Sequence, residues 1–212
     1  MSDKQYISSY CRISKNQVHV NGNISFESDK NKSFPEFIKE VYKHLGMSYP
    51  KFYKMDHLSK LGLVATEFLL DYEKKPDLSG PGTGIVLANS VSSLDTDIAY
   101  QKTISKKEEY FPSPAVFVYT LPNIVMGEIC IKHHIQGESI FFVNKDFDPS
   151  LMHFYVNDLF QRKDLNSILL GWVDYLDNDY LSLFCLVKKN PSTEKDCSEK
   201  INFTVHDLEK LF

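Results

Sequence analysis

The feature that most constrains the fold of this chain is the stretch at residues 113–137, SPAVFVYTLPNIVMGEICIKHHIQG. Its residues 115–119 form a short apolar run of β-branched and aromatic side chains, which is typical of a buried strand. Thr120, Leu121 and Pro122 form a corner, and Asn123 is well placed to cap a helix that ends near Gly137. The stretch therefore predicts a strand, a tight turn and a helix.

The predicted helix is unusually apolar. At 100° per residue its apolar side chains fall on more than one side, so they do not form a single stripe. A helix that is hydrophobic nearly all round is expected to be buried nearly all round, either in the middle of a layered fold or beneath another molecule. The residues concerned are Ile124, Val125, Met126, Ile129, Cys130, Ile131 and Ile135.

Composition predicts one domain over residues 1–212, because 212 residues with 42% hydrophobic content suffice for one sizeable core. A net charge of −4 without a basic run argues against a nucleic-acid partner. The polar start of the chain and the lack of an apolar run of about twenty residues predict no membrane contact and a cytoplasmic protein. The scattered cysteines, Cys11, Cys130, Cys185 and Cys197, are expected to be reduced.

Periodicity and turn signals predict an alternation of strands and helices. We expect strands at residues 6–13, 17–20, 85–91, 167–176 and 180–187, with 139–143 either a short strand or a buried extended segment. Helices are expected at 34–45, 52–73, 94–104 and 148–162. Residues 190–200 are predicted to be a mobile loop, followed by a return strand at 201–203 and a closing helix at 205–212. Strands separated by helices indicate an α/β sheet with mainly parallel strands.

Several motifs that resemble functional sites have a simpler structural interpretation. The glycine-rich loop at 79–84 lacks a following Lys-Ser/Thr pair and leads into a strand, so it is not expected to bind phosphate. Cys130 and His134 lie one helical turn apart, but no third ligand or orienting carboxylate is near in sequence. Asp95 and Asp97 are placed to cap a helix, and Asp71 is expected to be solvated. These residues predict no catalytic group, metal site or cofactor.

The order of the motifs resembles the N-terminal half of the β-ketoacyl synthases of the thiolase fold. The resemblance covers about residues 52–187 and rests on KMDHLSKLGLVATEFLLD, GIVLANSVSSLDTDIAYQKTI, SPAVFVYTLPN and ILLGWVDYL. Residues 171–174 resemble the family's Gly-x-x-Asp turn, and Ser113, Pro114, Phe117 and Asn123 resemble a divergent, ketosynthase-like N-terminal domain. This resemblance implies a thiolase-like half-fold, with a mixed, mainly parallel five-stranded sheet covered by helices.

In active members of that family, a nucleophilic cysteine stands at the corner between strand and helix. The corresponding position here is Pro122, a degenerate nucleophile position, and a shift of one residue gives Leu121 or Asn123. None of these forms a thioester. Two further histidines come from the family's C-terminal half, and we expect the chain to end before that half. The resemblance therefore implies a chain that is not an enzyme on its own.

A half-fold also predicts a partner. One face of the apolar helix needs covering, either by residues 201–212 or by another subunit. The resemblance implies that the strand before the corner pairs across a two-fold axis, in a homodimer or in a heterodimer with a full-length ketosynthase. The predicted dimer strand comprises Ala115, Val116, Phe117, Val118 and Tyr119, and the predicted partner-facing helix residues are Ile124, Met126 and Ile131.

Three functions follow from these interpretations. The first is a non-catalytic subunit, similar in role to a chain-length factor, in fatty acid or polyketide-type synthesis such as that of aryl polyenes or flexirubins, with an acyl carrier protein as a further partner. The second is a homodimeric acyl-binding or structural half-fold protein. The third is an acyltransferase with a relocated nucleophile, Cys130 or Ser113.

Overall fold

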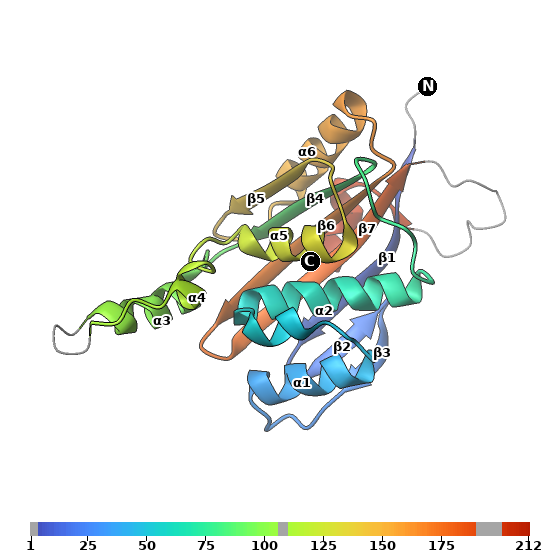
Figure 1. The fold of residues 1–212 in the computed structure, drawn as a ribbon. Coiled ribbons are helices and arrows are strands. Elements are labelled where there is room, and N and C mark those ends of the chain that lie inside the picture. The colour runs from blue at the N-terminus through green and yellow to red at the C-terminus, as the bar shows by residue number, and fades with distance from the viewer. Residues whose placement is uncertain (1–3, 106–109, 190–200) are drawn as a thin grey trace.

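A computed structural model of the chain describes residues 4–105, 110–189 and 201–212. A single mixed sheet of eight strands crosses the molecule, with helices on both faces (Figure 1). Seven strands form the order β3-β2-β1-β7-β6-β4-β5, and β8 pairs with β1. The structure confirms the α/β class, but the sheet has more strands than the five expected.

The strands fall into an antiparallel part and a parallel part. The N-terminal meander β1 (Gln5–Ser14), β2 (Gln17–Val20) and β3 (Asn23–Glu27) is antiparallel, as are the pairs β1–β7 and β6–β7. Only β5 (Ser139–Val143), β4 (Thr83–Asn89) and β6 (Ser167–Leu176) run parallel to one another. The expectation of a mainly parallel sheet was therefore wrong, because the long strands β1 and β7 (Asp179–Lys189) are joined to their neighbours as hairpins or by antiparallel pairing.

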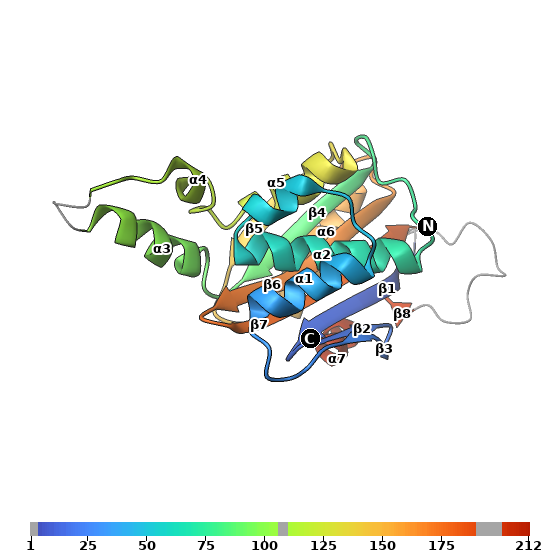
Figure 2. The ribbon, with the colours of Figure 1, turned by 60° about the horizontal axis from the view of Figure 1, so that its bottom comes forward.

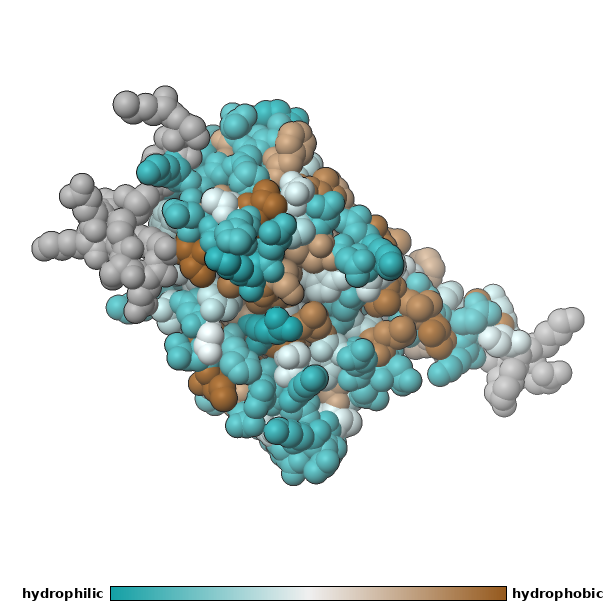
Figure 3. Space-filling model, turned by 180° about the vertical axis from the view of Figure 1, so that it is seen from behind, coloured by the Kyte–Doolittle hydropathy of each residue, from teal (hydrophilic) through white to brown (hydrophobic). Residues whose placement is uncertain are grey.

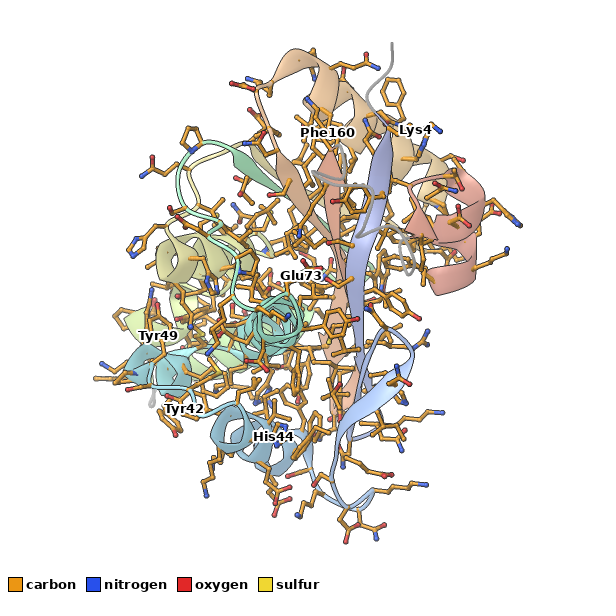
Figure 4. The ribbon with its side chains drawn as sticks, turned by 90° about the vertical axis from the view of Figure 1, so that its right-hand side faces the viewer. Lys4, Tyr42, His44, Tyr49, Glu73 and Phe160 are labelled. Carbon is orange, nitrogen blue, oxygen red and sulfur yellow. The ribbon has the colours of Figure 1, made fainter. Side chains whose placement is uncertain are left out.

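Successive side chains of the central strands point to opposite faces of the sheet and belong to two separate hydrophobic cores. Ile85 and Leu87 of β4 belong to the core under α1 (Phe34–His44), α2 (His57–Tyr72) and α5 (Ile124–His133). Val86 and Ala88 belong to the core under α6 (Pro149–Arg162) and α7 (Val205–Leu211). Figure 4 shows α1, with Tyr42 and His44, on one side of the sheet and α7 on the other. The strands are thus covered on both faces, as continuous apolar runs predict.

Helix α2 occupies the middle of its layer. It contacts α1, α5 and strands β1, β2, β6 and β7, and eleven of its sixteen residues are buried. Asp56 begins the helix by accepting a hydrogen bond from the Ser59 amide at 3.0 Å. The predicted helix at 52–73 is therefore shorter at its start, where the separate 3₁₀ turn η1 (Pro50–Lys54) takes the first residues.

Two helices project from the body as an arm. The helix α3 (Leu94–Ile104) and the short helix α4 (Pro114–Phe117) extend beyond the ends of β4 and β5, as Figures 1 and 2 show. The predicted strand at residues 115–119 is wrong, since this segment contains α4 and none of it joins the sheet. We call residues 94–121, as far as they are described, the arm.

The end of the chain lies on the far face from α5. The strand β8 (Ile201–Asn202) pairs with β1, and α7 packs against α6. The predicted return strand and closing helix are confirmed, but they do not cover α5. The loop predicted at 190–200 lies outside the described residues.

Candidate functional site

The candidate site is the edge of the sheet formed by β5, together with the arm and the helices beside it. Strand β5 pairs with β4 on one side only, and no described strand pairs with its other side. Its sequence, SIFFV, carries no charge. An exposed, uncharged edge is a template for pairing with another chain, and native proteins seldom leave one open.

The hydrogen-bonding pattern shows which backbone groups of β5 are open. The Ile85 amide donates to the Glu138 carbonyl, and the Asn144 amide donates to the Asn89 carbonyl, both at 2.9 Å. Because the direction of these bonds alternates along a parallel strand, the amides of Ser139, Phe141 and Val143 point away from β4. The site therefore presents a row of unpaired backbone donors and acceptors.

The strand β5 leads through a tight corner into α6. Asp148 caps α6 by accepting a hydrogen bond from the Leu151 amide at 2.9 Å, and Pro149 takes the first helical position. Phe147 stacks on Phe212 of the C-terminal segment, with ring centroids 3.5 Å apart. The corner at residues 144–148, NKDFD, contains no thiol and no hydroxyl group. It cannot supply a covalent nucleophile of the cysteine or serine kind.

The sequence-based interpretation of residues 113–137 is correct for the helix, which is α5, and wrong for the strand before it. A strand, a tight corner and a helix also occur in that order at residues 139–162, where both elements had been predicted separately. The Pro122 assignment depended on a strand at 115–119, and that segment is helical and largely exposed. The signal that was missed is a short apolar strand followed closely in the sequence by a helix that begins at Asp148 and Pro149.

Helix α5 is buried on one side only. Val125, Met126 and Ile129 are buried, whereas 58% of the Ile131 side chain is exposed. The prediction that this helix is buried nearly all round is therefore wrong. The helix ends at His134 in the left-handed conformation (φ 55°) and not at Gly137 as expected.

The buried side of α5 is tied closely to α2. Gly62 of α2 leaves room for Val125, because a Cβ atom at Gly62 would lie 2.4 Å from the Val125 Cγ2 atom. Glu67 of α2 contacts Lys132 Nζ at 2.9 Å and His133 Nε2 at 2.8 Å. Burial alone would raise the pKa of Glu67, but the hydrogen bonds from His133 and Lys132 hold it below its ordinary value. These contacts fix α5 in place, and His133 serves this structural role.

A buried carboxylate anchors the start of α5 to the arm. Glu128 accepts a hydrogen bond from the Tyr119 hydroxyl at 2.9 Å, and its second oxygen lies 2.7 Å from Lys51 Nζ of η1 as an ion pair. Burial, followed by the hydrogen bond to Glu128, raises the pKa of Tyr119. Tyr119 is the only residue of the predicted dimer strand that is buried, and it acts as an internal anchor.

A cavity of about 190 Å³ lies where the arm meets the body. On its polar side, the Thr96 hydroxyl donates to Asp56 at 3.2 Å, and His57 Nδ1 lies 3.3 Å from an Asp95 oxygen. Burial raises the pKa of Asp56. Asp95 and Asp97 lie in the first turn of α3, next to Ser93, so neither is the cap itself. The apolar lining comprises Met55, Ala99, Ala115 and Val116.

Exposed apolar side chains lie on β5, on α5 and, in greatest number, on the arm. Seen from behind, hydrophobic atoms gather where the arm leaves the body (Figure 3). Between 43% and 82% of each of these residues is exposed. They are Val143 on β5, Ile131 on α5, and Leu94, Ile98, Tyr110, Phe111, Phe117, Val118 and Leu121 on the arm. The group of exposed apolar side chains on the arm marks a candidate interaction site.

Other classes of site find little support. Within residues 4–105, 110–189 and 201–212, no group of three or more His, Cys, Asp or Glu side chains is arranged to hold a metal ion. Cys130 is half-buried, and burial raises the pKa of its thiol. Ser113 caps α4, with its hydroxyl 3.4 Å from the Val116 amide. No helix among the described residues is long and apolar enough to span a bilayer.

Known sequences give no match to this chain, whereas solved structures give matches to its fold. No protein-family profile matches the chain, and no curated protein sequence matches it. Among solved structures, the ishigamide ketosynthase/chain length factor is similar with a TM-score of 0.61 and 16% identity over 90% of this chain. A type II polyketide synthase ketosynthase in complex with its acyl-carrier protein gives a TM-score of 0.63 and 15% identity, again over 90% of this chain.

A third similar structure is a ketosynthase in complex with its chain length factor from Xenorhabdus doucetiae. It gives a TM-score of 0.55 and 11% identity over 89% of this chain and 80% of the other. The chain spans only 63% of the ishigamide protein and 64% of the type II polyketide synthase chain. Together these similarities show that the chain has a ketosynthase-like thiolase fold.

Proposed function

We propose that this chain is a non-catalytic ketosynthase-like subunit, of the chain-length-factor kind, that associates with a full-length ketosynthase through the edge of β5. The observation that carries this proposal is that open edge, together with the exposed apolar side chains on the arm. The similar structures include ketosynthases and chain length factors in complex with each other, which supports a partner of the same fold.

The corner between β5 and α6 supports a role without covalent catalysis. If this corner is the counterpart of the family's nucleophile corner, the cysteine is replaced within Asn144–Asp148. The earlier candidate, Pro122, also lacks a nucleophile, so either assignment leads to the same proposal. A subunit of this kind would contribute shape and association to its partner, in a fatty acid or polyketide-type pathway such as aryl-polyene or flexirubin synthesis.

An acyl carrier protein is a further proposed partner of the assembled complex. One of the similar structures is a ketosynthase held together with its acyl-carrier protein. We propose that the carrier binds once this chain and the ketosynthase have assembled.

The test is co-expression with the ketosynthase encoded nearest to this chain's gene, followed by light scattering after gel filtration. We expect a 1:1 complex. The variant Val143→Pro removes an outward amide of β5 and no bond to β4, so it should abolish the complex and leave the fold intact. Val143→Thr is the matched control and should preserve the complex. A complex that tolerates Val143→Pro, or no complex at all with the unaltered chain, would contradict the proposal.

A second candidate function is that of a homodimeric acyl-binding protein. The observation that favours it is the cavity of about 190 Å³ at the base of the arm, with its apolar lining. Binding of a short fluorescent fatty acid, lost in Ala99→Trp because the new side chain fills the cavity, is the expected result. Binding that Ala99→Trp leaves unchanged would place the probe elsewhere and remove this candidate.

A further inference from the structure

We infer that this chain binds a phosphate monoester in a cavity at the opposite end of the sheet from the arm. The cavity has a volume of about 960 Å³, which is within the range of small-molecule sites in proteins. It is formed by the start of β1, the ends of β7 and α6, and the connection between β8 and α7. The inference is independent of the proposed pairing at β5.

The charge of this cavity differs from that of the whole chain. The chain has more acidic than basic residues, 28 against 24. The described residues that line the cavity nevertheless include Lys4, Lys189 and His153, and no aspartate or glutamate. No ion pair joins Lys4 or Lys189 to a carboxylate within residues 4–105, 110–189 and 201–212. A cationic cavity in an acidic chain favours an anionic ligand.

One wall of the cavity is a polar stripe along α6. His153, Asn157 and Gln161 follow one another at spacings of four, so they lie on one side of the helix. The His153 ring is stacked on Phe203, with ring centroids 5.2 Å apart, and Asn157 Nδ2 lies 3.0 Å from His153 Nε2. These contacts hold the imidazole in place at the wall of the cavity.

Lys189, at the end of β7, forms a second wall and is held by the last turn of α6. Its Nζ atom donates a hydrogen bond to the Phe160 carbonyl at 2.5 Å and lies 5.3 Å from the centre of the Phe160 ring. This bond offsets the negative end of the helix, which would otherwise repel an anion. An ammonium group has three N–H donors, so two remain for a ligand.

The start of β1 and the connection between β8 and α7 complete the cavity. Gln5 pairs with Lys189 across β1 and β7, which places Lys4 at the same end of the sheet. Figure 4 shows Lys4 and Phe160 together at this end. The Phe203 amide donates to the Gln5 carbonyl at 3.2 Å, so the connection is fixed beside β1. The basic groups therefore come from three segments that are far apart in sequence.

This arrangement suits a phosphate better than a carboxylate. A phosphate monoester carries about two negative charges and three acceptor oxygens that point in different directions. A carboxylate carries one charge and two oxygens in one plane. Basic groups on three walls can contact three phosphate oxygens at once, and the remaining volume of the cavity holds the rest of the molecule.

The first experiment is isothermal titration calorimetry of the full chain with ribose 5-phosphate. We expect saturable binding with a dissociation constant below about 1 mM, and no binding of ribose. Inorganic phosphate should compete for the same site. Ribose that binds as tightly as ribose 5-phosphate, or a phosphorylated sugar that shows no saturable binding, would overturn the inference.

Three variants locate the site. Lys4→Gln removes a charge, and Lys189→Gln removes a charge while leaving an amide that can donate to the Phe160 carbonyl. His153→Phe keeps a ring on Phe203 and removes both ring nitrogens. Each variant should raise the dissociation constant for ribose 5-phosphate about ten-fold, as expected for the loss of a charged hydrogen bond.

The matched control is Lys39→Gln, which removes an exposed lysine from α1 on the other face of the sheet. It should bind ribose 5-phosphate like the unaltered chain. Urea denaturation without ligand should give similar midpoints for all these proteins, whereas the stabilisation by ribose 5-phosphate should be smaller in the three site variants only. Equal affinity in the site variants and the control would overturn the inference.

Two sources offer a phosphate monoester, a soluble sugar phosphate and the headgroup of a lipid. Co-sedimentation with vesicles that contain phosphatidic acid distinguishes them. Retention on these vesicles that is lost in Lys4→Gln assigns the bound phosphate to a lipid, and no retention assigns it to a soluble molecule. Either result, after binding in the calorimeter, upholds the phosphate site. Failure of the calorimetric test overturns this inference and leaves the proposed complex with a ketosynthase standing.

Discussion

The two most apolar helices of the molecule, α2 and α5, lie side by side and have opposite surroundings. Helix α2 is enclosed by α1, α5 and the sheet, and its exposed positions, Asp71 and Tyr72, lie in its last turn. Helix α5 is covered by α2 on one side, and its other side carries an exposed Ile131. An apolar sequence therefore indicates that a helix requires covering, but not what covers it. The described residues cover α2 almost completely and α5 only in part.

The largest expected effect is in α2. Leu61 is fully buried in the middle of that helix, so Leu61→Ala should lower the free energy of unfolding by about 3 to 4 kcal/mol. Urea denaturation followed by circular dichroism measures the loss, and an unchanged m-value shows that the transition is the same one. A loss below about 1 kcal/mol would mean that α2 is not the enclosed helix described here.

A second variant acts on the contact between the two helices. Gly62→Ala places a methyl group 2.4 Å from Val125, so it should separate α5 from α2 and cost about 2 kcal/mol. The double variant Gly62→Ala with Val125→Ala removes the clash and should lose less than the sum of the two single changes. Strict additivity in this double-mutant cycle would show that the two positions do not touch.

A third change concerns the pH dependence of the same contact. The folded-state pKa of Glu67 lies below the ordinary value of about 4.3, so its stabilising effect is present above that value and is lost as the pH falls through the lower, folded-state pKa. Glu67→Gln should cost about 1 kcal/mol at neutral pH and little in acid. Denaturation midpoints at several pH values measure this. Equal losses at pH 7 and pH 3 would contradict the assignment.

The smallest effect on folding is expected at Ile131, the exposed residue of α5. Ile131→Ala should change the free energy of unfolding of the isolated subunit by no more than about 0.5 kcal/mol, because the side chain is already largely in water. Measured beside Leu61→Ala at a concentration where the chain is monomeric, this variant sharpens the comparison of the two helices. A loss of 2 kcal/mol or more would show that α5 is buried within its own subunit.

Sequence patterns predicted where helices and strands lie better than they predicted which elements pack or pair with one another. Periodicity located β4, α3, α6 and the β6–β7 hairpin, because burial on a sheet face or a helical stripe is recorded in the local order of residues. The same reasoning failed for residues 115–119. Their β-branched and aromatic side chains favour a strand, but a strand needs a pairing partner, and Ser113 caps a short helix there instead.

The candidate site was predictable only in part. The proposal of a partner rests on the apolar character of Ile124 to Ile131, and the sequence shows directly that neither Pro122 nor residues 144–148 include a thiol. Which strand forms the edge could not, because sheet order depends on crossovers and not on any one segment. Likewise, the buried Glu128 has no local signature, since Tyr119 and Lys51 reach it from different elements.

The position of β1 has a consequence for how the polypeptide acquires its structure. The first strand of the chain is an inner strand of the sheet, and its long partner β7 begins only at Asp179. Contacts between residues so far apart in sequence are slow to form. On the ribosome, the hairpin of β1 and β2 keeps one edge open until β7 has emerged, and a fragment that stops before Asp179 should fail to fold.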